Sequence, residues 1–184
     1  AHGQADCASR VLSNADGPVQ FGFPSGFTAA QLLRAYELPG FATGKMPPVL
    51  SVIIAFDAPT ILHDLNYYSK TMEIPSLPSC KGPIAESATP CFQKLDQRGK
   101  RHFSKQTDWA MAASIGVESA HAICQNCSIL LMESDDNWSN NLFPAVDEAA
   151  ELGARFVDVG FLLYTDESKD NYRYYDQFFD HFPG

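Results

Sequence analysis

The fold of this chain is decided by one stretch of its sequence, Trp109-Ala-Met-Ala-Ala-Ser-Ile-Gly-Val-Glu-Ser-Ala-His-Ala122. The small and apolar residues in it predict a buried helix from about Asp108 to Ala122, with Thr107 or Asp108 as its N-cap. A short turn then leads to Ser128-Ile-Leu-Leu-Met-Glu133, an apolar run that is typical of a strand buried on both faces of a parallel sheet.

Similar patterns alternate along the rest of the chain. The expected strands are Val49–Phe56, Cys91–Leu95, Ile129–Glu133 and Phe156–Phe161. The other expected helices are Phe27–Tyr36 with Thr28 as N-cap, Thr60–Lys70, Asn141–Leu152 and Asn171–Phe182. Strands that alternate with helices predict a three-layer αβα fold around a mainly parallel sheet. Residues 1–25 are punctuated by Gly and Pro and are expected to form an extended arm, with residues 26–184 as the α/β domain.

Composition excludes several classes of protein. The 184 residues are 45% hydrophobic and 19% charged, as expected for one globular domain. A net charge of −9 argues against nucleic-acid binding, which needs clustered Lys and Arg. No apolar run approaches the roughly 18 residues of a membrane span. The first residues lack the pattern of a signal peptide, so we expect that any such peptide has been removed.

The five cysteines indicate an oxidising compartment. Cys80 and Cys91 flank a loop rich in Pro, Gly and Ser, and a disulfide closing it would add about 2–4 kcal/mol of stability. We therefore expect a secreted or periplasmic protein. Cys124 and Cys127 form a C-x-x-C motif after a helix, whereas redox motifs open one. A structural disulfide is favoured, within that pair or from one member to Cys7, which is otherwise free or paired to another chain.

Seven short motifs follow one another in a fixed order over about residues 26–184. They are Gly26–Pro39, Ala55–Pro59, the segment from Leu77-Pro-Ser-Cys80 to Cys91-Phe92, Val117–Ala122, Ile129–Glu133, Ala145–Ala154 and Tyr175–Gly184. In this order they resemble the first half of the catalytic domain of the sedolisins, the serine-carboxyl peptidases. The resemblance implies a subtilisin-like fold and a short disulfide loop between Cys80 and Cys91.

The resemblance also implies that catalysis has been lost. Sedolisins carry a glutamate base on the central helix and an aspartate four residues later, and here those positions hold Ala112 and Gly116. Two carboxylates at this spacing share one helix face, and their closeness raises one pKa so that a proton is shared. Neither Ala112 nor Gly116 can bind a proton. The family's oxyanion aspartate and nucleophilic serine would follow after Gly184, so the resemblance describes a truncated domain without catalytic residues.

The expected function is therefore binding by a secreted pseudopeptidase, with no cofactor and no metal. The vacated positions Ala112 and Gly116, with Asp57, form the expected ligand cleft, and a protein partner or a second copy would cover the surface that truncation exposes. A glycine inside a helix costs about 1 kcal/mol, so a neighbouring backbone is expected to pack closely on Gly116. The alternative function is that of a fragment or subunit of an active acid endopeptidase.

Three further patterns have simpler interpretations. Glu118 and His121 could ligate a metal from one helix face, but an ion pair or a helix-end hydrogen bond is the favoured role. Asp57 follows a strand as the aspartate of a subtilisin-type triad does, yet a turn role suffices without a matching serine motif. Asn126 and Asn137 begin N-x-S patterns, which leaves their glycosylation open.

Overall fold

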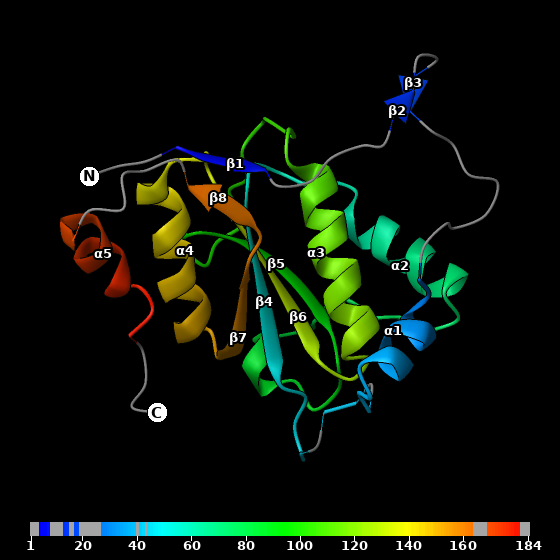
Figure 1. The fold of residues 1–184 in the computed structure, drawn as a ribbon. Coiled ribbons are helices and arrows are strands. Elements are labelled where there is room, and N and C mark those ends of the chain that lie inside the picture. The colour runs from blue at the N-terminus through cyan, green and yellow to red at the C-terminus, as the bar shows by residue number, and fades with distance from the viewer. Residues whose placement is uncertain are drawn as a thin grey trace.

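A four-stranded parallel sheet forms the centre of the protein (Figure 1). The computed structural model describes residues 4–7, 13–14, 17–18, 27–39, 41–42, 44–163 and 169–180. The sheet has the strand order β5-β6-β4-β7, and all three of its pairings are parallel. Its strands are β4 (Val49–Ala55), β5 (Phe92–Asp96), β6 (Ser128–Ser134) and β7 (Ala154–Val159). Three of the four expected strands are present with shifted ends, and the fourth is replaced by β7 and a second, shorter strand.

Helices cover both faces of this sheet, which confirms the predicted three-layer architecture (Figure 1). On one face lie α1 (Ala29–Ala35), α2 (Ile61–Thr71) and α3 (Ala110–Ile123); on the other lies α4 (Ser139–Glu151), with α5 (Lys169–Asp176) outside it. A short 3-10 helix, η1, spans Ile84–Glu86. None of the helices in the described ranges is long and apolar enough to cross a membrane.

The apolar runs of β4 and β6 are explained by their central positions. Each is paired on both sides and covered by helices on both faces, so nearly every side chain is buried. Leu130, Leu131 and Met132 are fully buried, as is Ile53 of β4. Strands buried in this way lose the alternation of polar and apolar residues that a half-exposed strand shows.

Two short antiparallel pairs lie outside the main sheet. β1 (Ala5–Cys7) pairs with β8 (Phe161–Leu163), and β2 (Ser13–Asn14) pairs with β3 (Gly17–Pro18). The single strand predicted over Phe156–Phe161 was wrong, because the parallel pairing ends at Val159 and the chain crosses to β1 after Gly160. Most of the expected arm, residues 1–25, lies outside the described residues, although Ala5 is buried.

The ends of several helices differ from the predicted ones. Thr28 caps α1 as expected, since its hydroxyl accepts the Gln31 N–H at 3.2 Å. The N-cap of α3 is Trp109, without a side-chain hydrogen bond, so the prediction of Thr107 or Asp108 was wrong. Trp109 is buried and packs edge-on against Phe56, so core packing takes the place of a cap there.

The last helix ends at Asp176, before the expected end at Phe182, which itself lies outside the described residues. The side chain of Gln177 donates a hydrogen bond to the Tyr174 carbonyl at 2.6 Å. This bond satisfies one of the carbonyls that are left unpaired at the end of a helix. Phe178 then stacks on Phe143 of α4, which holds the segment against the domain.

Candidate functional site

Ala112 and Gly116 line an apolar cavity of about 310 Å³ between α3 and the sheet. Ile115 completes the wall that α3 provides, and Val52 and Ile54 of β4 form the floor. The open side is lined by Asp158 of β7 and by Gly160, which follows that strand. The two positions that the sequence singled out thus lie together in one hollow. Among its seven lining residues Asp158 alone has an ionisable side chain.

The cavity exists because the end of the sheet is only partly covered. In the parallel pairing of β4 with β7, Val52 lies opposite Asp158 and Leu50 opposite Phe156. Residues that lie opposite each other point to the same face of a sheet, and Val52 points to α3. The side chains of Phe156 and Asp158 therefore lie on the α3 face as well. No further strand pairs with β7 in the sheet of the described residues. Phe156 is therefore 58% exposed, and Ile115 on the facing side of α3 is 49% exposed.

Gly116 is explained by close packing, although the neighbour is a side chain and not the backbone that was expected. A Cβ built at this position would lie 2.7 Å from Cγ1 of Val52, much closer than a normal carbon contact. The Oδ2 atom of Asp158 would lie 3.7 Å away. Glycine therefore allows α3 to approach β4 closely, and it leaves the adjoining hollow empty.

Asp57, the third residue of the expected cleft, does not line this cavity. It lies at the carboxyl end of the sheet, where it forms an ion pair with Lys94 of β5. The Lys94 ammonium also donates to the Ala58 carbonyl at 3.1 Å and lies 3.3 Å from Oε2 of Glu133 on β6. Three neighbouring strands thus bring two carboxylates and one lysine together, because parallel strands end at the same edge.

Burial controls the charge of this cluster. Glu133 is 2% exposed, and its Oε1 accepts the N–H of Ala58 at 2.8 Å. Burial raises the pKa of Glu133 to about 8, and the negative charge of Asp57 adds to the rise while Lys94 opposes it. Glu133 therefore takes up a proton more readily than an exposed glutamate does. Lys94 and Glu133 were not predicted as site residues, although a charged residue at the end of the apolar run Ile129–Glu133 was a usable signal.

Glu118 and His121 lie on α3 without a third potential metal ligand beside them in the described residues. No group of three potential ligands occurs among the described residues. The Nε2 atom of His121 lies 2.7 Å from the carbonyl of Pro75, and burial lowers the pKa of its imidazole. Burial raises the pKa of Glu118 to about 7, helped by the charge of Asp64 on α2. The hydrogen-bonding role that was favoured for His121 is the one observed.

Two disulfides are present. Cys80 is bonded to Cys91, in agreement with the expectation, and closes a loop with a sequence separation of 11. Cys124 is bonded to Cys127, so the alternative in which one of them pairs with Cys7 was wrong. Cys7 ends β1, and its side chain lies outside the described residues.

Both candidate glycosylation sites use their side-chain amides within the fold. The amide of Asn126 donates to the Ala42 carbonyl at 2.9 Å and accepts the N–H of the same residue at 2.6 Å. The amide of Asn137 donates to the carbonyl of Ala5 at 2.8 Å. A glycan on either nitrogen would have to compete with these contacts.

Comparisons with known proteins find one structural similarity. The chain is similar to Pseudomonas sedolisin, a serine-carboxyl proteinase complexed with two molecules of pseudo-iodotyrostatin, with 16% identity and a TM-score of 0.48. The similarity covers 74% of this chain and 35% of the sedolisin chain, so this chain spans about a third of that length. No protein-family model and no curated protein matches the sequence.

Proposed function

We propose that this chain is a secreted, non-catalytic binding domain of sedolisin-like architecture, which receives an apolar group of a protein partner beside α3. One observation carries the proposal: Ala112 and Gly116, at the positions of the carboxylates in the family that the sequence resembles, line an apolar cavity of about 310 Å³. A hollow of this size with few polar groups is typical of a binding site.

The chemistry of the lining supports a role without catalysis. General-base activation of a nucleophile needs an ionisable group within hydrogen-bond reach of a hydroxyl or thiol. The lining contains neither a hydroxyl nor a thiol, and its one carboxylate, Asp158, is exposed to solvent. The Asp57–Lys94–Glu133 cluster belongs to a different part of the sheet, where Lys94 forms an ion pair with Asp57 and lies 3.3 Å from Glu133.

The surroundings of the cavity favour a protein as the partner. Ile115, which lines the cavity, is 49% exposed, and Met111, one helical turn before it, is 39% exposed. Phe156, two residues before Asp158 on the same face of β7, is 58% exposed. Large apolar side chains that gather on one face, with a hollow between them, are typical of a protein-interaction surface. The acidic Asp158 at the opening would select against an anionic group.

Binding of a neutral apolar probe tests the proposal. N-phenyl-1-naphthylamine should bind and gain fluorescence, and Ala112→Phe should weaken its binding about tenfold because the new ring fills the hollow. Asn66→Phe adds the same ring at an exposed position of α2 and should leave binding unchanged. Equal binding by the two variants, or no binding by the unchanged protein, would overturn the assignment of the cavity.

Incubation with unfolded protein at acidic pH tests the absence of catalysis. We expect no cleavage, and we expect none after Ala112→Glu and Gly116→Asp are combined, because the lining supplies no nucleophile. Cleavage by the pure chain that a serine-directed phosphonate inhibits would refute the proposal.

The alternative, a subunit of an active endopeptidase, has one specific observation in its favour. β7 is an edge strand in the sheet of the described residues, and its Phe156 is largely exposed, as in a sheet that continues into another polypeptide. Sedimentation velocity separates the two functions. A binding domain should sediment as a stable monomer or dimer, whereas a subunit should co-purify with a second chain that restores phosphonate-sensitive cleavage.

Secretion is proposed from the two disulfides, because such bonds persist in oxidising compartments and are rare in the cytosol. The expected result is that a reporter fused to the full-length protein is recovered outside the cytoplasm with both disulfides formed.

A further inference from the structure

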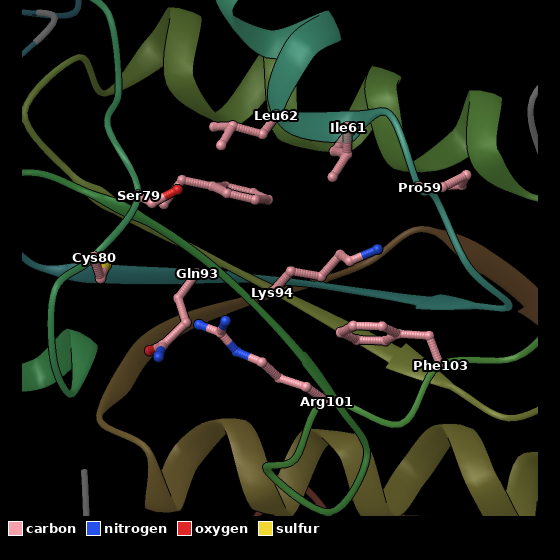
Figure 2. A pocket seen from close by; sticks show the side chains of 10 residues that line it. Pro59, Ile61, Leu62, Ser79, Cys80, Gln93, Lys94, Arg101 and Phe103 are labelled. Carbon is pink, nitrogen blue, oxygen red and sulfur yellow. The ribbon is translucent and has the colours of Figure 1, made fainter.

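A second cavity, of about 200 Å³, lies at the opposite edge of the sheet from β7 (Figure 2). The outer strand there is β5, which contributes Phe92, Gln93 and Lys94. The remaining lining residues are Pro59, Ile61 and Leu62 on the side of α2, Ser79 and Cys80 before the disulfide loop, and Arg101 and Phe103 after the turn that follows β5. Figure 2 shows side chains from all of these segments around one space.

The cavity has an apolar part and a cationic part. Ile61, Leu62 and the rings of Phe92 and Phe103 provide the apolar part. The ring of Phe103 is held in place by the Lys94 ammonium, which lies 4.2 Å from its centroid. Arg101 approaches from the other side, and its guanidinium lies beside the side chain of Gln93 (Figure 2).

The lining of the cavity contains two cations, Lys94 and Arg101. Lys94 is engaged by Asp57 and by the Ala58 carbonyl, and Arg98 is engaged by Asp96 and Asp135. For Arg101 no hydrogen bond or ion pair is found among the residues that the structure describes. A guanidinium is a planar fork of donors that matches both oxygens of a carboxylate.

The edge of β5 offers a backbone site in the same place. On the outer side of β5, the Phe92 N–H donates to the Pro78 carbonyl at 2.7 Å, and the Phe92 carbonyl accepts the Cys80 N–H at 2.9 Å. Further along the same edge, the Asp96 N–H donates to the Lys100 carbonyl at 2.7 Å. Lys94 lies between them, and alternation along the strand directs its N–H and C=O toward the same outer edge. Within the described part of the chain no backbone group pairs with Lys94 on that edge.

We propose that this cavity binds the C-terminal residue of a peptide whose last side chain is apolar. The terminal carboxylate pairs with Arg101, the last peptide unit bonds the open backbone groups of Lys94, and the side chain packs among Ile61, Leu62 and Phe103. Capture of a chain terminus combined with addition to a strand edge is a known mode of peptide recognition. The cavity is smaller than the roughly 300–1,000 Å³ of sites for drug-sized ligands, which suits a single residue.

Fluorescence anisotropy with a labelled peptide tests the proposal. The probe is an N-terminally labelled hexapeptide that ends in Ala-Gly-Leu with a free carboxylate, and its partner probe is the same peptide as the C-terminal amide. The free acid should bind at least about tenfold more tightly than the amide, since a charge-assisted hydrogen bond is lost in the amide. Arg101→Gln should remove this difference, and Arg101→Lys should retain part of it.

Matched controls separate the site from general electrostatics. Lys105→Gln removes an exposed cation outside the cavity and should leave the affinity unchanged. Leu62→Glu places a carboxylate in the apolar part and should abolish binding, with circular dichroism confirming that the variant is folded. Equal binding of acid and amide, or full affinity in Arg101→Gln, overturns the proposal. If 4-methylpentanoate competes as strongly as the acid peptide, the Lys94 backbone contributes nothing and the cavity is a site for small acids.

Discussion

Replacement of Gly116 by alanine tests the close approach of α3 to β4. At an ordinary helix-interior position this change stabilises a protein by about 1 kcal/mol. Here the new methyl group would lie 2.7 Å from Cγ1 of Val52. Val52 is 1% exposed, is paired in the sheet on both sides, and has a branched side chain with few rotamers.

The two effects oppose each other, and the structure indicates which is larger. Overpacking of a buried contact costs about 1–3 kcal/mol, so Gly116→Ala should lower the free energy of unfolding by about 1 kcal/mol after the helix gain is included. In a Val52→Ala background the obstructing methyl groups are absent. There the same change should raise the free energy of unfolding by about 1 kcal/mol, which makes the coupling energy about 2 kcal/mol.

Urea denaturation of the four proteins of this double-mutant cycle, followed by circular dichroism, measures the coupling. Ser119→Ala, at an exposed position of α3, is the matched control and should have the same small effect in both backgrounds. A stabilisation of about 1 kcal/mol by Gly116→Ala in both backgrounds would refute the close packing of Val52 on α3.

Two further results are expected. The folded-state pKa of Glu118, about 7, lies above its usual value of 4.5, so its contribution to stability is complete below pH 4.5 and is lost as the pH rises through 7. Urea midpoints at pH 5 and pH 8 should therefore differ less in Glu118→Gln than in the unchanged protein; an equal difference would contradict the raised pKa. Removing the Cys80–Cys91 disulfide, with its sequence separation of 11, should cost about 3 kcal/mol. Removing Cys124–Cys127, with a separation of 3, should cost about 2 kcal/mol, and the reverse order in urea melts would contradict the loop-entropy argument.

Helices and strands were predictable from the sequence wherever residue type and local spacing match the burial that each segment has in the fold. The apolar run Val49–Ala55 is a central strand that is buried on both faces, and Thr28 caps its helix with its own hydroxyl. Prediction was wrong where a distant contact decides. Phe161 leaves the direction of β7 because β1 provides another pairing partner, and Trp109 begins α3 because it packs on Phe56. Such contacts join residues that are far apart in the sequence and leave no local pattern.

The residues of the candidate sites were also predictable only where local spacing decides their position. Ala112 and Gly116 could be placed together because residues four apart share one helix face. Their facing residues, Val52 and Asp158, come from two other strands, so the cavity itself could not be predicted. Asp57 was expected in that cleft, but it lies beside Lys94 of β5. The residues that surround the turn after β4 depend on the order of the strands in the sheet, which the local sequence does not give.

The sequence alone determined the alternation of strands and helices, the parallel sheet, the disulfide-closed loop and the absence of carboxylates at Ala112 and Gly116, because all of these are properties of residue type and spacing. The tertiary structure alone decided that Gly116 is matched to Val52, that Glu133 shares Lys94 with Asp57, and that Arg101 lies over the open edge of β5. These features depend on the order and register of strands distant in the chain, which only the packed sheet establishes.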